Sequence, residues 1–97
     1  MRYEVKFPSN PIAKKFKKTL NDISPKELQN TIREETLSLA HNPRPYSEPK
    51  IKPPLEVYSY VAQYRLRIGD YRVLYDVDDK RRIVWILAMR KRNERTY

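Results

Sequence analysis

The chain has 97 residues, 39% of them hydrophobic and 34% charged, which is enough for one domain with a single modest core. Lysine and arginine outnumber aspartate and glutamate by 21 to 12, and the net charge of +9 favours a polyanionic partner, with nucleic acid ahead of an anionic membrane or an acidic protein. The absence of cysteine excludes disulfides and sulfur-ligated metal sites, and a single histidine excludes a His-rich one.

The first two elements are predicted from hydrophobic periodicity. Residues 2–7 alternate between charged and apolar side chains, which predicts a half-buried strand. Ser9 or Asn10 can cap the helix that follows, whose apolar residues Ile12, Phe16, Leu20 and Ile23 recur on one face. The rest of that helix surface carries Lys14, Lys15, Lys17 and Lys18. Four lysines there favour a solvated face over a phosphate-gripping one.

A second helix is predicted from its start signal. Ser24-Pro-Lys-Glu27 reads as a capping box, with serine at the N-cap, proline at the first helical position and glutamate at the third. The helix presents Leu28, Ile32 and Leu39 on one side and ends near residues 40–43, where proline blocks continuation. His41 therefore lies at a helix C-terminus, where we expect it to act as a cap and not as a catalytic base.

A proline-rich segment separates the helices from the C-terminal strands. Residues 43–54 hold five of the eight prolines and are predicted to form an extended loop. Leu55–Ala62 has an ambiguous pattern that fits either a strand or a connection. The parts on either side of the loop are too short to fold alone, so residues 1–97 are predicted to form a single domain.

The C-terminal third is predicted to form a hairpin and a final strand. Apolar residues alternate with arginines over 64–68, and Gly69-Asp70, with the only glycine of the chain, makes a tight turn into the next strand. A polar turn at 78–81 leads to the most apolar strand, Arg82–Met89. Trp85 is expected in the core, on the face covered by the helices.

These elements predict an α+β fold in which two N-terminal amphipathic helices pack on one face of a small, mostly antiparallel sheet. The helices are expected to cover the face of Leu66, Val73 and Tyr75, or that of their neighbours. The opposite face, which bears the arginines, is expected to remain open as a concave platform.

The arginines of this open face are the candidate functional group. Arg65 and Arg67 are two residues apart on one strand and point to the same side, and a neighbouring strand can bring Arg72 beside them. On the last strand, the parity of Val84, Ile86 and Ala88 continues into Arg90 and Arg92, with Tyr97 beyond. Guanidinium groups bind phosphate oxygens bidentately and stabilise a phosphorane dianion. Alternating arginines on a strand also serve solubility and edge protection, which is the alternative interpretation.

At these residues the chain resembles the RelE/ParE superfamily of bacterial and archaeal toxins. The resemblance rests on Tyr64-Arg-Leu-Arg-Ile-Gly-Asp-Tyr-Arg-Val-Leu-Tyr75, on the apolar strand, and on the closing Arg92 and Tyr97. It covers nearly the whole chain and implies a RelE-like fold. For the RelE branch it also implies a metal-independent and cofactor-independent ribonuclease that cuts mRNA in the ribosomal A site. A cognate antitoxin, usually small and acidic, is implied as a partner.

The resemblance also implies roles for individual residues. Arg65 and Arg67 match a basic pair, often lysine in the family, and Arg72 matches the arginine expected to hold the scissile phosphate. Arg92 and Tyr97 match the closing arginine and the tyrosine that stacks on or activates the nucleotide, with Arg90 as an alternate for Arg92. Lys50 and Lys52 match a basic loop residue that binds RNA. Because arginine hardly deprotonates, arginine in place of lysine leaves the general base open.

Two other functions fit the same sequence. A ParE-like toxin with this fold would inhibit DNA gyrase without nuclease chemistry, and a basic module would bind nucleic acid without toxicity. No apolar run approaches the ~18 residues of a spanning helix, and residues 1–25 lack the apolar region of a signal peptide. We therefore expect a cytoplasmic protein without a membrane partner.

Overall fold

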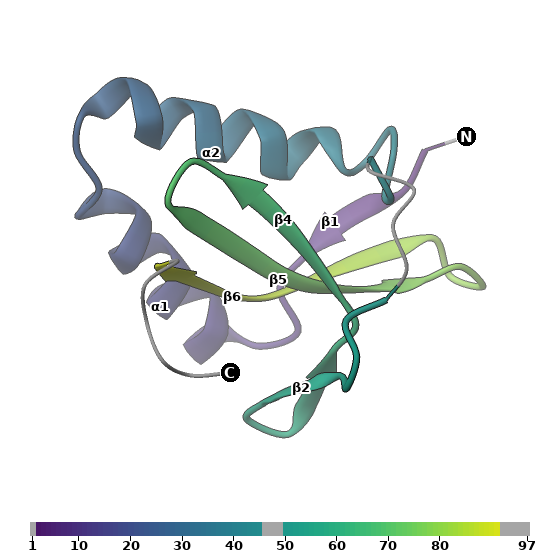
Figure 1. Cartoon of the computed structure of the whole chain (residues 1–97). Coiled ribbons are helices and arrows are strands. Elements are labelled where there is room, and N and C mark those ends of the chain that lie inside the picture. The colour runs from purple at the N-terminus through teal and green to yellow at the C-terminus, as the bar shows by residue number, and fades with distance from the viewer. Residues whose placement is uncertain (1, 46–49, 92–97) are drawn as a thin grey trace.

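Figure 1 shows a strand and two helices followed by the remaining strands of the domain. The computed structural model describes residues 2–45 and 50–91. In chain order the elements are β1 (Glu4–Lys6), α1 (Asn10–Asn21), α2 (Lys26–Ser38), β2 (Leu55–Val57), β3 (Tyr60–Ala62), β4 (Tyr64–Ile68), β5 (Tyr71–Asp78) and β6 (Ile83–Lys91). The ambiguous segment 55–62 thus forms two short strands.

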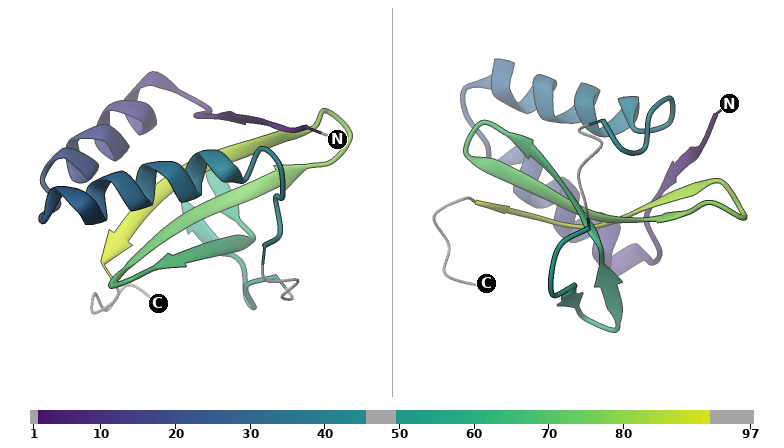
Figure 2. Two further views of the ribbon diagram at one scale, coloured as in Figure 1. Left: turned by 90° about the horizontal axis from the view of Figure 1, so that it is seen from above. Right: turned by 45° about the vertical axis from the view of Figure 1, so that its right-hand side comes forward.

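The main sheet has four strands in the order β1-β6-β5-β4. β1 runs parallel to β6, with Val5 opposite Val84, whereas the β6–β5 and β5–β4 pairs are antiparallel. β2 and β3 form a separate antiparallel hairpin. The helices pack on one face of the main sheet and the hairpin on the other, and the right-hand view of Figure 2 shows α2 above the sheet and the hairpin below it. The predicted architecture, two helices on one face of a mostly antiparallel sheet, is confirmed.

Helix α1 forms as its sequence predicts. Ser9 is the N-cap, and its hydroxyl oxygen accepts a hydrogen bond from the backbone N–H of Ile12 at 3.4 Å. The buried face consists of Ile12, Phe16 and Leu20. The four lysines are all exposed, as expected of a solvated face.

Helix α2 begins later than predicted. Pro25 has extended backbone angles (φ −71°, ψ 168°) and is itself the N-cap, so the helix starts at Lys26 and has no side-chain capping hydrogen bond. The expected capping box at Ser24 is therefore wrong, because the residue at the cap position has no side-chain oxygen. The helix ends at Ser38, and the exposed His41 lies beyond its last turn. None of the described helices is long and apolar enough to cross a membrane.

The main core lies between the helices and the sheet. Its fully buried members include Ile32 of α2, Val73 and Tyr75 of β5, and Val84 and Ile86 of β6. Each such side chain contributes about 1.5–3 kcal/mol through removal of apolar surface from water. Leu66, Val73 and Tyr75 face the helices, which confirms that prediction.

The other face of the sheet carries a second, smaller core that the sequence did not predict. Val57 and Ala62 of the hairpin pack on Leu74 and Leu87 of the main sheet, and the half-buried Trp85 lies against them. Trp85 is thus on the face opposite the helices, and its predicted placement is wrong. The hairpin also covers part of the face expected to be open.

Candidate functional site

Three arginines form a row across the sheet on the face opposite the helices. Arg67 of β4 is directly opposite Arg72 of β5, which is directly opposite Arg90 of β6. Adjacent strands lie about 4.8 Å apart, so the row brings three guanidinium stems onto neighbouring positions of a rigid support. Arg65 lies two residues before Arg67 on the same side of β4. The predicted convergence of arginines therefore includes Arg65, Arg67, Arg72 and Arg90.

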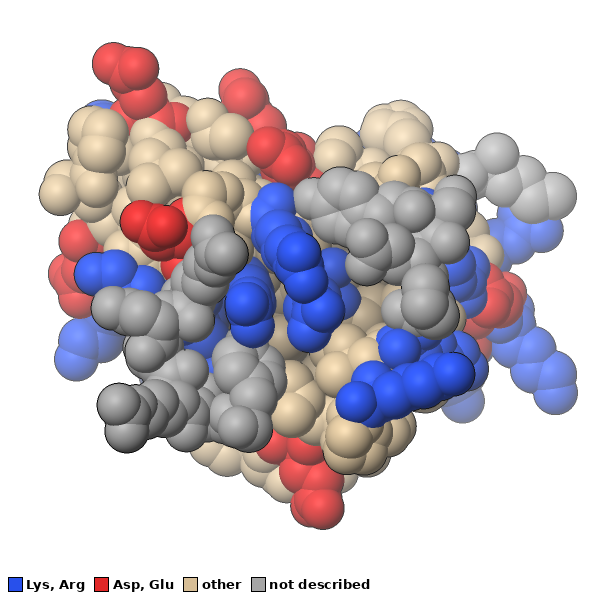
Figure 3. All heavy atoms as spheres, viewed as in Figure 1, with Lys and Arg blue, Asp and Glu red and all other residues tan. Residues whose placement is uncertain are grey.

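The surroundings of the row strengthen its pull on anions. Arg65, Arg72 and Arg90 are half-buried and Arg67 is exposed. Arg65 is opposite Leu74 on β5, and Leu74 is opposite Ala88 on β6. The apolar side chains of Leu74 and Ala88 therefore lie beside the arginine row on the same face of the sheet. Figure 3 shows basic side chains gathered in the middle of this view, over β4 and β5. Neighbouring guanidinium groups of like charge add to the positive potential of this face.

A β-bulge in β6 places the Arg90 side chain on the same face as Arg67 and Arg72. The pairing of β5 with β6 shifts between Leu74, which is opposite Ala88, and Tyr75, which is opposite Ile86. Leu87 is the extra residue, so Val84 and Ile86 face the helices whereas Ala88 faces the other side. The predicted common parity of Val84, Ile86 and Ala88 is therefore wrong. A β-bulge changes the side of the sheet to which the following residues point. In a regular strand, Arg90 would point to the same side as Ile86, which is the side of the helices.

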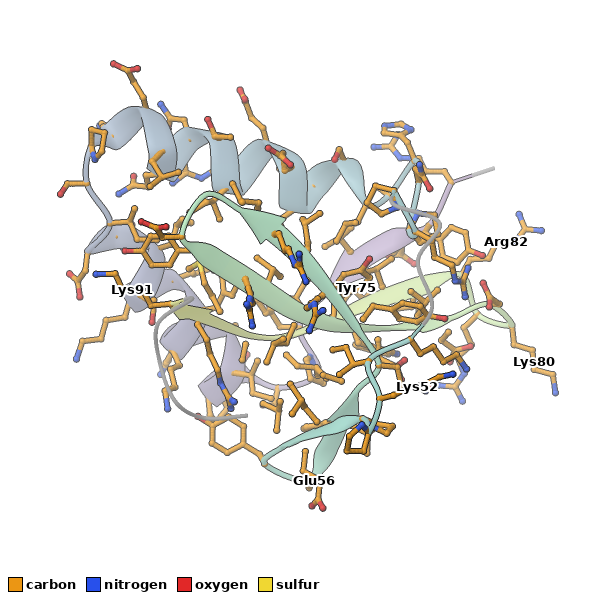
Figure 4. The ribbon with its side chains drawn as sticks, in the orientation of Figure 1. Lys52, Glu56, Tyr75, Lys80, Arg82 and Lys91 are labelled. Carbon is orange, nitrogen blue, oxygen red and sulfur yellow. The ribbon has the colours of Figure 1, made fainter. Side chains whose placement is uncertain are left out.

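The remaining predicted site residues have different placements. Arg92 and Tyr97 lie outside the described residues, and their roles stay predictions. Lys50 and Lys52 are exposed on the segment that leads into β2, and Figure 4 shows Lys52 at the base of the hairpin. Lys50 is near enough to Asp79 to help lower the pKa of that carboxyl. It therefore lies near the C-terminal end of β5, whereas Arg72 lies at the N-terminal end of that strand. The structure does not bring Lys50 into the row.

An ion-pair network that the sequence analysis missed ties the proline-rich loop to the sheet. Both terminal guanidinium nitrogens of Arg44 donate to the Asp79 carboxylate, at 2.7 and 3.3 Å, and its Nε donates to the hydroxyl of Tyr64 at 3.1 Å. The hydroxyl of Tyr3 also donates to Asp79, at 2.6 Å. A single arginine between two prolines was the only sequence signal for this network.

The network continues into the core through stacked tyrosines. The ring of Tyr64 stacks on that of Tyr75, with 5.7 Å between centroids. The Tyr75 hydroxyl donates to the carbonyl of Pro43 at 2.8 Å, and the side chain is only 2% exposed. The start of the loop is therefore fixed to β4, β5 and the β5–β6 turn together.

Titration of Asp79 should report this network. The hydrogen bond from Arg44, followed by that from Tyr3, holds the pKa of the Asp79 carboxyl below its ordinary value. The pKa of Asp79 is lower in the folded than in the unfolded protein, so its ionised carboxylate stabilises the fold at a pH above the unfolded-state pKa. This stabilisation is lost as the pH falls through the folded-state pKa. Because Asp79 is exposed, the contribution is small. We expect an NMR titration of the Asp79 carboxyl carbon to have a low midpoint that rises in Arg44→Ala; an equal midpoint in the variant would contradict the assignment.

Comparison with known proteins relates this geometry to a family. The model of one family, described as the ParE toxin of type II toxin-antitoxin system, parDE, matches residues 11–96. No curated protein matches the sequence. Among solved structures, the chain is similar to a chain of the archaeal RelE–RelB complex from Pyrococcus horikoshii OT3, with 30% identity and a TM-score of 0.67. That match covers 97% of this chain and 99% of the other.

Two further structures share the fold. The first is the toxin–antitoxin complex RelBE2 from Mycobacterium tuberculosis, with 25% identity, a TM-score of 0.62 and coverage of 95% of this chain and 100% of that one. The second is a double mutant of the E. coli toxin RelE in the free state, at 17% identity and a TM-score of 0.59, with coverage of 96% and 86%. The match to the family model over most of the chain shows that this protein belongs to the RelE/ParE family of toxins of type II toxin–antitoxin systems.

Proposed function

We propose that this toxin is an endoribonuclease that cleaves mRNA by attack of a ribose 2′-hydroxyl on the adjacent phosphate. The observation that carries the proposal is the row of Arg67, Arg72 and Arg90 on one rigid sheet face. Guanidinium groups present paired N–H donors that match two phosphate oxygens, and they remain charged at any physiological pH. The similarity to a RelE chain favours the RelE branch, for which the sequence resemblance implies this activity.

The reaction needs charge stabilisation more than any other contribution from the protein. The 2′-oxygen loses its proton and attacks phosphorus, the bond to the 5′-oxygen breaks, and that oxygen leaves after taking up a proton. The products are a 2′,3′-cyclic phosphate and a 5′-hydroxyl. The reaction passes through a phosphorane, which carries one more negative charge than the starting diester. Fixed positive groups therefore stabilise the phosphorane more than they stabilise the diester.

The position of each arginine suggests its role. Arg72 has an arginine opposite it on either side and is placed to bind the phosphorane oxygens. Arg67 and Arg65, along β4, would position the chain of phosphates. None of these groups is suited to proton transfer, because arginine does not give up its proton in this pH range. Tyr97 is proposed to stack on the nucleotide or carry a proton, and Arg92 to assist Arg72.

We propose two macromolecular partners besides the message. Cleavage on the ribosome follows from the RelE resemblance, with Lys50 and Lys52 as further RNA contacts. The solved relatives from P. horikoshii and M. tuberculosis are complexes with antitoxins, and a chain with a net charge of +9 should attract an acidic antitoxin segment by electrostatic steering.

Inhibition of DNA gyrase is the second candidate function. It is favoured by the description of the matching family model, which is that of a ParE toxin. In that case the basic face would bind a protein or DNA surface, and no phosphodiester bond would be broken by the toxin itself.

Inducible expression in a bacterial host separates these functions. We expect growth arrest within one generation, and primer extension on a translated message should map cuts inside codons. Arrest with intact mRNA, DNA breaks and an SOS response would instead identify a gyrase inhibitor. Normal growth together with salt-dependent RNA binding would identify a binding module and overturn both toxin activities.

A further inference from the structure

A cavity of about 390 Å³ opens beside the arginine row. It lies at the C-terminal end of β6, between that strand, helix α1 and the tip of the β2–β3 hairpin. Figure 4 shows Lys91, one of its lining residues, at the end of the sheet beside α1. The volume falls within the range of small-ligand pockets, about 300–1,000 Å³, and is sufficient for one nucleoside.

Arg90 joins the cavity to the row, because it lines the cavity and is also directly opposite Arg72. A nucleotide whose phosphate rests on the row can therefore direct its base or that of its neighbour into the cavity. From the proposed ribonuclease function and this geometry, we infer that the cavity is a subsite for one nucleobase of the RNA, with Tyr58 as its stacking platform.

Tyr58 is an unusual residue for its position in the hairpin loop. It stands in the two-residue loop of the hairpin, and 60% of its surface is exposed. Its φ of 59° lies in the left-handed region, where a bulky residue is an outlier and asparagine or glycine is usual. Neither burial nor turn geometry explains a tyrosine at this position.

Lys15 of helix α1 holds Tyr58 in place beside the cavity that both residues line. The Nζ of Lys15 on α1 donates a hydrogen bond to the Tyr58 hydroxyl at 2.7 Å. The walls combine apolar side chains, including Phe16 and Ala88, with the polar groups of Thr19 and Asp22. Such a lining suits a base, which has an apolar face for stacking and hydrogen-bonding groups along its edge.

The inference can be tested with two short ligands of equal charge. The first is an RNA trinucleotide with 2′-deoxy first and central nucleotides, so neither phosphodiester bond can be cleaved by 2′-hydroxyl attack; the second has the same backbone without bases. Dissociation constants are measured by calorimetry at one salt concentration. Tyr58→Asn removes the ring and suits the left-handed backbone, so the fold is kept. We expect it to weaken binding of the first ligand about tenfold, as loss of one stacked base predicts, and to leave the second unchanged.

Companion variants make the result specific. Tyr58→Phe keeps the ring and should retain most of the affinity, and Val61→Ala changes an exposed residue of the same hairpin that does not line the cavity, so it should match the wild type. Equal affinity of Tyr58→Asn and the wild type for the first ligand overturns the nucleobase subsite. Arg72→Ala should weaken both ligands; if it weakens neither, the proposed ribonuclease site fails as well.

Discussion

Replacing Arg72 by alanine is expected to lower the rate of RNA cleavage by about 10²–10³-fold, the effect of removing one donor to a developing oxyanion. The residue lies at the centre of the row, with Arg67 opposite on one strand and Arg90 on the other. No other arginine of the row has an arginine on both sides, so we expect the largest loss at this position. Primer extension on a translated message and the growth of the expressing host both report it.

Two comparisons sharpen this experiment. Arg81→Ala removes the same charge from an exposed residue at the β5–β6 turn, where it makes a 4.0 Å ion pair with Asp78, and should leave cleavage unchanged. Arg72→Lys keeps the charge but loses the planar pair of donors, so an intermediate rate is expected. Thermal unfolding of each variant shows whether the fold is intact. Cleavage by a folded Arg72→Ala protein at the wild-type rate would refute the proposed role.

Ile32→Ala is expected to destabilise the fold by about 2–5 kcal/mol, through loss of buried surface and formation of a cavity. Ile32 is completely buried and belongs to the core between the helices and the sheet. Small domains have a total stability of about 5–15 kcal/mol, so this one change removes a large share of it. The urea midpoint should fall at a nearly unchanged slope.

Leu37→Ala is the matched control on the same helix. Leu37 is 58% exposed, and its truncation should change the stability by no more than about 0.5 kcal/mol. Unfolding of the two variants at the same urea concentration would contradict the burial of Ile32 between α2 and the sheet.

Local patterns in the sequence were sufficient for most of the secondary structure. The apolar spacing of Ile12, Phe16 and Leu20 predicted the buried face of α1, and the turn at Gly69-Asp70 predicted the β4–β5 hairpin. Gly69 does adopt the positive φ (58°) that such a turn uses. The start of α2 was predicted wrongly because Ser24 matches the capping-box pattern, whereas the extended backbone of Pro25 makes that residue the N-cap.

The candidate site was predicted less completely than the fold. Arg65, Arg67 and Arg72 could be placed together because a tight hairpin fixes which residues lie opposite each other. The Arg44–Asp79 ion pair joins residues that are 35 positions apart, and the Tyr58–Lys15 hydrogen bond joins residues 43 positions apart. Contacts at such separations leave no periodic signal in the sequence.

The sequence by itself determined most of the elements, their amphipathic faces and the excess of positive charge, since each of these depends on composition or on residues a few positions apart. Only the tertiary structure decided which side of the sheet Arg90 occupies, where the second core forms and what closes the cavity beside the row. The reason is physical: strand parity can be read along a chain, but the bulge at Leu87 reverses it, and Leu87 packs with Leu74 against a hairpin formed elsewhere in the chain.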